Sequence, residues 1–293
     1  MSRIVVLGDL NLDVHAIDPA DASPGDEIRA SVRAVPGGSA GTFARTAAGV
    51  GASVLFIGCV GNDLVGDLLV RSLEERDIES AVGRVALPSG TILALQQGEE
   101  RTMVCSRGAN DGLSVEMVDA VDFSCVDHLH VSGYAFLSSR QCPAALHAIK
   151  LAGTYGATIS VDPPPASLIE AHGRASFLTY LDRVAWIFPN HAEGRVLTGR
   201  SEPEGIFDEL ADRFSSGALT LGVKGALAWD GASRDAAAPP AAHAGNTTGA
   251  GDAFAAGFTV ARLEGASLAE ANARACELAA DHVQRNGRET ASG

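Results

Sequence analysis

The chain contains very little lysine and few aromatic residues. Only Lys150 and Lys224 are lysines among its 293 residues, and 5% of the residues are aromatic. Its 22 basic residues are outnumbered by 36 acidic ones, which gives a formal net charge of −14. Because a chain this acidic repels polyanions at long range, we expect no binding to nucleic acid or to an anionic membrane surface. This charge does not prevent binding of a phosphate-bearing ligand, which local dipoles and one or two cations can hold.

Paired cysteines and long apolar runs are also missing. The five cysteines are scattered and none forms a C-x-x-C pair, so neither a zinc site nor a disulfide framework is predicted. No stretch approaches the roughly 18–20 apolar residues of a membrane-spanning helix, and the N-terminus lacks a signal-peptide pattern. The 46% of hydrophobic residues can nevertheless build a large core. We therefore expect a soluble cytoplasmic protein that does not enter a membrane.

Short apolar runs alternate with helical patterns along most of the chain. Strands are predicted at residues 4–7, 54–57, 128–131, 158–161, 184–188 and 219–223, and helices at 42–49, 65–76, 139–152 and 206–214. A last helix is expected to begin with the capping box of Ser267 and Glu270 and to end at Gly287. This alternation predicts an α/β fold: a doubly wound, mostly parallel sheet with helices on both faces. Residues 1–293 are expected to form one domain, with antiparallel segments at about 14–35 and 80–110 inserted as a small β lid.

A glycine-rich turn opens the apolar helix pattern near residue 250. It contains Gly249, Ala250 and Gly251, and Asp252 follows in the first predicted helical turn. The free N–H groups and the positive dipole end of such a turn can bind an anion. An anion cradle beside a carboxylate is what phosphoryl transfer to a hydroxyl requires, because the carboxylate can accept the alcohol proton. The alternative interpretation is a plain helix N-terminus whose aspartate favours the dipole.

Two segments near the N-terminus carry residues suited to a ligand crevice. Asn11 and Asp13 follow the first strand, and the carboxyl ends of central strands face the crevice of an α/β sheet. Their side chains could therefore bind vicinal hydroxyls. Gly37 and Gly38 precede a helical pattern and allow a small polar molecule to approach the backbone closely. A structural glycine turn is the alternative for this pair.

These three segments, in this order, resemble the ribokinase-like (PfkB-type) carbohydrate kinase family over nearly the whole chain. Asn190-His-Ala-Glu193 looks like the family's N-x-x-E motif, and Thr220-Leu-Gly-Val-Lys-Gly225 looks like its nucleotide-binding strand and turn. Asp162 begins a proline-rich turn that is similar to one in ribokinases. The resemblance implies ATP- and Mg²⁺-dependent phosphorylation of a hydroxyl, expected to be primary, on a sugar or a sugar-like small molecule.

The resemblance also implies roles for individual residues. Asp252 would be the base, with an anion hole formed by Gly249, Ala250 and Gly251. The residues that would hold the sugar are Asn11, Asp13, Gly37, Gly38 and Thr42. The residues that would line the nucleotide site are Asn190, Thr220, Gly222, Lys224 and Gly225. Glu193 would hold Mg²⁺ through water. The lid would close over the substrate, and a homodimer through the exposed edges of the lid is an expected assembly.

The sequence departs from the family pattern at three places. Asn246 replaces the usual aspartate, and since an amide is a weaker cation ligand, activation by K⁺ is doubtful. Thr42 replaces a sugar-contacting asparagine, and Ser39 replaces the lysine of close ribokinases. The acceptor therefore stays open between a free sugar and a nucleoside of the adenosine or pseudouridine type.

Other functions compete with a kinase at this stage. A non-catalytic sugar- or nucleotide-binding regulator would keep the same fold. A dinucleotide-dependent oxidoreductase would need G-x-G-x-x-G after the first strand, where only Gly8 is present. His128 and His130 share one face of a predicted strand and could begin a metal site, but no third ligand has a suitable spacing, so structural histidines are the preferred interpretation.

Overall fold

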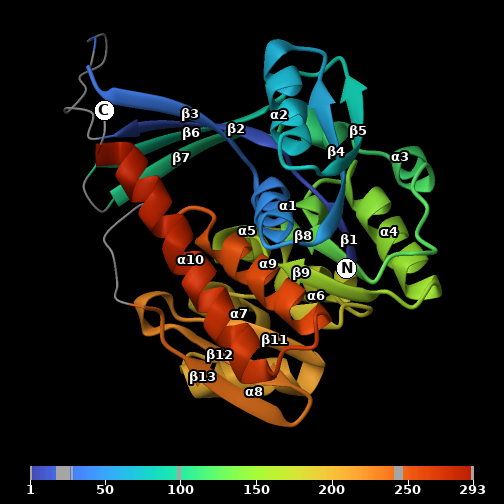
Figure 1. The fold of residues 1–293 in the computed structure, drawn as a ribbon, viewed down its shortest axis with the longest axis vertical. Coiled ribbons are helices and arrows are strands. Elements are labelled where there is room, and N and C mark those ends of the chain that lie inside the picture. Colours follow the sequence, from blue (N-terminus) through green and yellow to red (C-terminus); the bar gives the residue numbers. More distant parts are fainter. Residues whose placement is uncertain (1, 18–26, 28, 98–99, 241–246, 292–293) are drawn as a thin grey trace.

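The computed structural model describes residues 2–291 except 18–26, 28, 98–99 and 241–246. The described residues form one nine-stranded sheet and one four-stranded sheet, with helices packed around the larger sheet (Figure 1). The strands of the large sheet are β1 (Arg3–Leu7), β4 (Ser53–Gly61), β5 (Glu79–Val85), β8 (His128–Ser132), β9 (Thr158–Asp162), β10 (Trp186–Ile187), β11 (Ser216–Thr220), β12 (Ala226–Asp230) and β13 (Ser233–Ala237). Their order across the sheet is β13-β12-β11-β10-β9-β8-β1-β4-β5.

The large sheet is mostly parallel, as the continuous apolar strands predict. All pairs from β11 to β5 are parallel, and only β12 and β13 add antiparallel pairs at one edge. Side chains of β1 alternate between two hydrophobic cores, with Val5 and Leu7 in one and Ile4 and Val6 in the other. Both faces of the strand are therefore buried, which confirms the doubly wound α/β fold.

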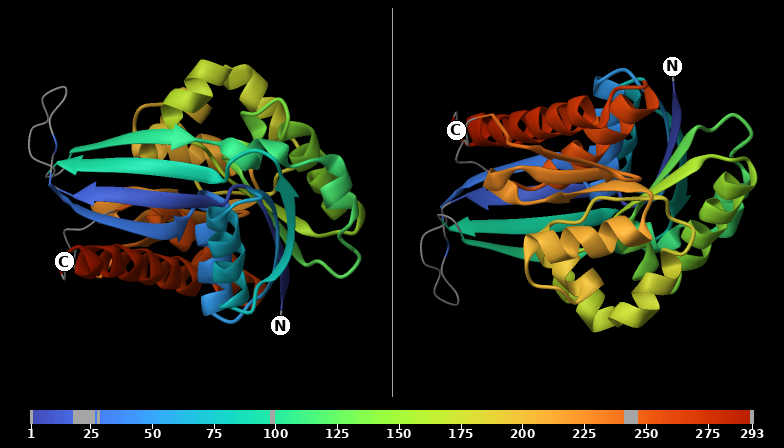
Figure 2. Two further views of the ribbon diagram at one scale, coloured as in Figure 1. Left: turned by 90° about the horizontal axis from the view of Figure 1, so that it is seen from above. Right: turned by 90° about the horizontal axis from the view of Figure 1, so that it is seen from below.

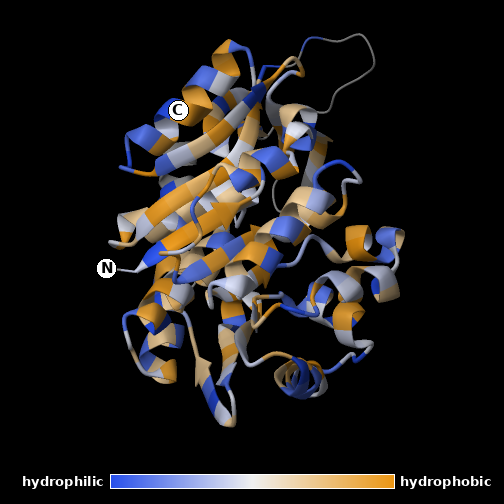
Figure 3. Ribbon diagram, turned by 90° about the vertical axis from the view of Figure 1, so that its right-hand side faces the viewer, coloured by the Kyte–Doolittle hydropathy of each residue, from blue (hydrophilic) through white to orange (hydrophobic). Residues whose placement is uncertain are grey.

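Helices cover the two faces of the large sheet (Figure 2). One face is packed by α1 (Ser39–Gly49), α2 (Leu64–Glu74), α9 (Ala250–Leu263) and α10 (Leu268–Ala291). The other face is packed by α3 (Val115–Asp119), α4 (Cys142–Thr154), α5 (Ala166–His172), α6 (Arg174–Tyr180), α7 (His191–Thr198) and α8 (Pro203–Arg213). Figure 3 shows the hydrophobic strands enclosed between these layers. No helix in the described part of the chain combines the length and apolar character that crossing a bilayer requires.

The four-stranded sheet stands beside the large one and has the place expected of a lid. Its strands are β2 (Asn11–Ile17), β3 (Ser31–Gly37), β6 (Gly90–Gln97) and β7 (Glu100–Ser106), in the order β3-β2-β6-β7. It is a mixed sheet, because β2 and β6 pair in parallel while the other pairs are antiparallel. Of the segment expected at 80–110, residues up to 85 belong to β5 at the edge of the large sheet, and the small sheet begins at Gly90.

Two predicted element ends are wrong. The expected strand at 219–223 ends at Thr220, because Gly222 has a φ of 61° and residues 222–224 form the short 3-10 helix η3 (Gly222–Lys224). The last helix does not stop at Gly287 but continues to Ala291. A single glycine within a helix costs only about 1 kcal/mol, so it does not by itself end the helix. The capping box at its start is confirmed, since Ser267 N donates to Glu270 Oε2 at 2.9 Å and Glu270 N donates to Ser267 Oγ at 3.3 Å.

Candidate active site

Asp252 lies in the first turn of α9 and is only 9% exposed. Ser39 Oγ, at the start of α1, donates a hydrogen bond to Asp252 Oδ1 at 2.6 Å. Asp162 at the end of β9 shares a second hydrogen bond with the Asp252 carboxyl group. Burial is the main cause that raises the pKa of Asp252 to about 6, and the hydrogen bonds from Ser39 and Asp162 act against it. Such a carboxyl is ionised at neutral pH and can still accept a proton.

The turn before Asp252 has the backbone that its glycines predict. Gly249 caps α9 with a φ of 79°, and a Cβ there would lie 2.7 Å from His282 Nε2 and 3.1 Å from Thr42 Cγ2. His282 Nε2 is also 2.9 Å from the Thr248 carbonyl oxygen, so α10 supports the turn. A Cβ at Gly251 would meet no heavy atom within 4 Å. Open space therefore adjoins the turn at Gly251.

The amide groups at the start of α9 are not equivalent. The first amides of any helix lack an intrahelical acceptor. Here Ala250 N donates to the Thr247 carbonyl at 3.2 Å, so this member of the predicted anion hole is already engaged. Among the described residues, the amides of Gly251 and Asp252 form no such backbone bond outside the helix. Those two amides are the donors best placed to receive an anion.

Asp9 connects the two central strands of the sheet. It follows β1 and accepts hydrogen bonds from Ser39 N at 3.0 Å, Ser132 Oγ at 2.9 Å and Asn11 Nδ2 at 3.2 Å. β1 and β8 are neighbours, although the chain visits β4 and β5 on the other side of β1 between them. The site therefore lies at a point where the strand order reverses, which is where α/β sheets bind ligands.

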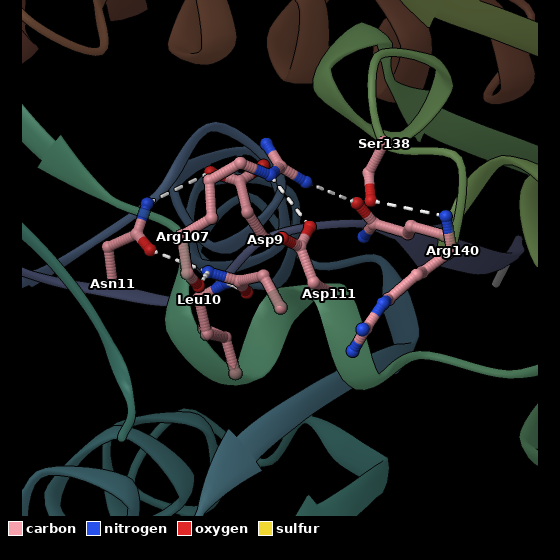
Figure 4. A network of polar contacts seen from close by, with 9 residues as sticks. Asp9, Leu10, Asn11, Arg107, Asp111, Ser138 and Arg140 are labelled. Carbon is pink, nitrogen blue, oxygen red and sulfur yellow. Dashed lines mark hydrogen bonds and ion pairs between the residues drawn. The ribbon is translucent and has the colours of Figure 1, made fainter. Parts of the chain in front are cut away.

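Asn11, the first residue of β2, belongs to a network of polar contacts that includes Leu10 and Arg107 (Figure 4). Asn110 lies in the 3-10 helix η1 (Gly108–Gly112), accepts a bond from Leu10 N at 3.0 Å and donates to Asn11 Oδ1 at 2.8 Å. In the same network, Arg107 donates to Asp111 at 2.8 Å and to Gln141 at 2.6 Å. Both ends of the Asn11 amide thus contact protein, with Nδ2 at Asp9 and Oδ1 at Asn110, so this side chain holds the start of β2.

Asp13, Gly37 and Thr42 come together beside the turn of α9. A Cβ at Gly37 would lie 2.1 Å from Asp13 Oδ2, so the glycine is needed for the aspartate to occupy its position. Gly38 caps α1 with a φ of 85°, and the Thr42 methyl group approaches Gly249. The structure therefore brings Asp13 against Gly37, and Thr42 against the turn that precedes Asp252.

Asn190 and Glu193 form a capping box at the start of α7. Glu193 N donates to Asn190 Oδ1 at 3.0 Å, and Asn190 N donates to Glu193 Oε2 at 2.9 Å. Asn190 Nδ2 also donates to Glu193 Oε1 at 2.6 Å. Burial, with a smaller contribution from Asp252, raises the pKa of Glu193 to about 8. The motif thus has a structural role, and its carboxyl group also lies within the electrostatic reach of Asp252.

The predicted nucleotide segment lies farther along the same edge of the sheet. Thr220 ends β11 and pairs with Asn190, while Gly222 and Lys224 belong to the exposed η3. Gly225 has a φ of 87°, and a Cβ there would lie 1.9 Å from the Ala237 carbonyl oxygen. These residues lie on the β11 side of β10, whereas the acceptor residues lie on the β1 side. The structure therefore separates the two predicted subsites along one edge.

The sequence analysis assigned no role to several residues of this site. They are Asp9, Ser39, Arg45, Tyr134 and Asp162. Tyr134 follows β8, and burial together with Asp9 and Asp252 raises the pKa of its hydroxyl. Asp9 and Asp162 could have been found, because each is a polar residue at the carboxyl end of a buried strand.

His128 and His130 form no metal site with other residues of the described chain. Both imidazoles contact Ser160 Oγ at 2.8 Å, and His130 stacks on Phe43 with 3.6 Å between ring centroids. The preferred interpretation as structural histidines agrees with these contacts. The five cysteines are free thiols.

The fold and this arrangement of groups define an α/β phosphotransferase that acts on an alcohol group. The family model described as pfkB family carbohydrate kinase matches residues 1–292, and the chain belongs to this family. It is therefore a kinase of sugars or nucleosides, which confirms the family resemblance and the enzyme class expected from the sequence.

Relatives and solved structures agree with this assignment. The chain is 30% identical over 242 residues to 2-dehydro-3-deoxygluconokinase of Bacillus subtilis, covering 78% of this chain and 74% of the relative. It is 26% identical to ribokinase of Haemophilus influenzae, covering 97% and 93%. A crystal structure of a putative ribokinase II from E. coli in complex with ATP and Mg²⁺ superposes with a TM-score of 0.86 at 21% identity, covering 98% of this chain and 94% of that one.

Proposed function

We propose that this kinase transfers the γ-phosphoryl group of ATP to a hydroxyl, expected to be primary, of a sugar or sugar-like small molecule, with Asp252 as the base. The observation that carries the proposal is the position of Asp252. Its carboxyl group is buried, held by Ser39, and lies in the same helical turn as Gly251, where space is open. A base must reach the acceptor hydroxyl while donors face the transferred group, and this turn supplies both.

The chemistry follows from the groups at the start of α9. Asp252 accepts the proton of the acceptor hydroxyl, and a pKa of about 6 leaves it ionised at neutral pH. The predicted anion hole of Gly249, Ala250 and Gly251 provides backbone donors and the positive end of the helix dipole. Because Ala250 N already bonds Thr247, we assign the largest part of this role to the amides of Gly251 and Asp252.

We assign the acceptor to a set of residues beside the turn at residues 249–251, and we call this set the wall of the acceptor site. Asp13, Gly37, Gly38 and Thr42 are assigned to it, and Asn11 holds the start of β2, the strand that carries Asp13. The four-stranded sheet, through β2 and β3, supplies these residues or the segments beside them. Closure of this sheet over the acceptor would exclude water, which would otherwise compete for the phosphoryl group.

The residues present suit ATP and Mg²⁺. Open space at Gly222 and at Gly251 leaves room for a ligand beside each glycine, and Asn190, Thr220, Lys224 and Gly225 accompany Gly222 along the edge. The buried Glu193 carboxyl group, whose pKa of about 8 leaves it largely protonated at neutral pH until a cation favours its ionised form, offers the oxygen ligands that Mg²⁺ prefers, and we assign it to Mg²⁺ through water. When bound, Mg²⁺ neutralises charge on the phosphates. The K⁺ expectation depends on Asn246, which lies outside the described residues.

The sequence predicts a homodimer through the exposed edges of the lid; we propose instead that two copies of the chain pair through the outer, apolar faces of their lids. By register, Leu93 of β6 lies beside Val104 of β7 and Val14 of β2, on the face opposite to Asn11 and Asp13. Val104 is 57% exposed and Val32, on the same face of β3, is 62% exposed. Replacing Val104 with Asp would weaken such a dimer, and sedimentation of wild type and variant tests this. A wild-type chain that sediments as a monomer contradicts it.

A nucleoside acceptor is the second candidate. Tyr134 favours it, because a half-buried aromatic ring close to Asp9 and Asp252 could stack on a base. A free sugar needs no such ring.

The proposed function is tested by a panel of sugars and nucleosides incubated with ATP and Mg²⁺. We expect acceptor-dependent release of ADP with at least one class, and its loss in the Asp252→Asn variant. A non-catalytic regulator would instead show ligand-dependent protection against heating without ADP release. Equal ADP release by the variant would remove Asp252 from its assigned role.

A further inference from the structure

Arg45 is a half-buried arginine of α1 that the reaction described above does not use. It lies three residues after Thr42, on the same side of the helix. Its Nη2 donates to the Pro36 carbonyl at 3.0 Å and lies 3.5 Å from the Gly37 carbonyl and 3.4 Å from Thr42 Oγ1. Two of these three partners belong to the wall assigned to the acceptor. The guanidinium group is therefore part of that wall.

One donor of this guanidinium group is unused. Arg45 Nη1 is shielded from solvent and has no hydrogen-bond partner in the described part of the chain. The oxygens that Nη2 contacts are two carbonyls and a hydroxyl, all of them neutral. Arg107 in the neighbouring network is different, because its Nε pairs with the Asp111 carboxylate at 2.8 Å (Figure 4). A buried donor without a partner is costly, and the cost is larger when the group is charged.

The positive charge of Arg45 is compensated only in part. Asp13, Asp252 and Asp9 favour the charged guanidinium, but burial outweighs them and lowers the pKa of Arg45 to about 10. Arg76 adds repulsion in the same direction. The group remains charged at neutral pH, and a further negative charge beside it would be stabilised. Of the three aspartates, Asp9 already accepts three hydrogen bonds from other residues.

The position of Arg45 also fits the departure at Thr42. Threonine is shorter than asparagine and lacks an amide donor. The Thr42 hydroxyl contacts Arg45, while its methyl group approaches Gly249 in the turn before Asp252. Arg45 thus places Nη2 beside the Thr42 hydroxyl and Nη1 toward Gly41, where a Cβ would lie 3.1 Å from it, and the guanidinium group carries a charge that an asparagine amide would lack.

We propose that the acceptor carries a small anionic group, a carboxylate or a phosphate, and that Arg45 binds it through Nη1. This inference rests on the proposed function, since it names the acceptor class for the same site. Sugar acids and sugar phosphates have the required chemistry. A charged hydrogen bond that is lost on substitution changes binding by about 1.5–3 kcal/mol, which corresponds to roughly 10- to 100-fold.

The test compares each anionic acceptor with a neutral sugar of the same skeleton. Suitable pairs are gluconate with glucose, and fructose 6-phosphate with fructose, within a wider panel of sugar acids and sugar phosphates. We expect wild-type kcat/KM to favour anionic members, and Arg45→Met to lower it by roughly 10- to 100-fold for them and by less than about threefold for neutral members. Arg45→Lys should keep part of the preference. Arg200→Met removes an exposed arginine paired with Glu209 and serves as the charge-matched control.

Calorimetric binding of the same acceptors without ATP separates this inference from the proposed function. Binding of anionic acceptors that depends on Arg45, without ADP release, would support the inference and contradict the kinase proposal. Phosphorylation of neutral sugars with no preference for anionic ones would do the reverse. Equal losses for neutral and anionic acceptors in Arg45→Met would show a structural role for Arg45 and overturn the inference, as would failure of every anionic acceptor to bind. The carboxylate and phosphate members of the panel distinguish the two anions.

Discussion

Two clusters of buried titratable groups differ in where they lie and in what surrounds them. The carboxyl cluster lies beyond the carboxyl ends of the strands and consists of Asp9, Asp162, Glu193 and Asp252. The histidine cluster lies within the large sheet and consists of His128, His130 and Ser160. Burial raises the pKa of Asp162, Glu193 and Asp252, and it lowers the pKa of both imidazoles. In both clusters, burial therefore acts against the charged form.

Burial holds the histidine cluster neutral, although His128 Nδ1 and His130 Nε2 have no hydrogen-bond partner in the described part of the chain. Ser160 Oγ has one proton, so it can donate to one imidazole and must accept from the other. His130 stacks on Phe43, and His128 packs against Trp186 with 5.1 Å between ring centroids. A neutral imidazole meets the hydrogen bond and the stacking together. This cluster contributes to the packing of β8, β9 and α1.

The carboxyl cluster brings acids from four different elements close to one another. Asp252 interacts with Asp162 through a shared proton and is repelled by Asp9, and Glu193 is repelled by Asp252. Ionising all of these carboxyls costs stability, so this arrangement is not explained by packing. Perturbed carboxyls that converge in this way are typical of functional sites. The comparison teaches that burial is compatible with packing where the neighbours suit the neutral form, and that it leaves carboxyl groups with perturbed pKa values where the neighbours are other acids.

The largest expected effect comes from removing the base of the carboxyl cluster. Asp252→Asn keeps the shape of the side chain but cannot accept the alcohol proton, so kcat should fall by about 10²- to 10⁴-fold. Its stability should not fall. The pKa of about 6 means that ionisation of Asp252 destabilises the fold above that pH, and the neutral amide avoids this cost. Steady-state kinetics and thermal unfolding at pH 8 measure both effects.

Asp212→Asn is the matched control, because Asp212 is exposed near the end of α8. It should change neither kcat nor the unfolding temperature. An Asp252→Asn variant that loses activity only because it unfolds would contradict the comparison between the clusters.

The sequence predicts the convergence of this site well for local reasons. The turn at Gly249 and Gly251 and the helix after it are encoded within a few residues, and so is the capping box of Asn190 and Glu193. Parallel strands then bring their carboxyl ends to one edge of the sheet. Local pattern and topology together are enough to place Asp252 in the first turn of a helix at this edge of the sheet.

The remaining features depend on contacts that sequence spacing cannot show. Ser39 and Asp252 are 213 positions apart, and Asn110 and Asn11 are 99 apart. The unused Nη1 of Arg45 depends on how deeply the fold buries the side chain. Glycine is typical of a helix C-terminus, but Gly287 lies inside α10. In each case tertiary packing, and not the local pattern, decides the outcome.

The second prediction concerns the histidine cluster. Ser160→Ala removes the hydroxyl shared by His128 and His130, so the free energy of unfolding should fall by about 1–3 kcal/mol. Activity of the folded enzyme should stay unchanged, because the cluster lies inside the sheet. Urea unfolding and kinetics on the same preparation test this. Ser216→Ala is the control: its buried hydroxyl makes one hydrogen bond, to the Trp229 carbonyl at 3.0 Å, and should cost less. An equal loss of unfolding free energy in both variants would mean that sharing the Ser160 hydroxyl between two imidazoles adds no stability.

The smallest expected effect is a shift in the pH dependence of kcat/KM in a variant that keeps Asp252. Ser39 Oγ stabilises the ionised Asp252, and its removal in Ser39→Ala should raise the pKa of that carboxyl further. Because the base acts when deprotonated, kcat/KM rises with pH through the pKa of Asp252. The rise should move to higher pH by about one unit, with activity near the wild-type value at pH 9. Ser39→Thr keeps the hydroxyl and should restore the wild-type profile. A uniform loss of activity at every pH would show that Ser39 positions the helix start and does not tune the base.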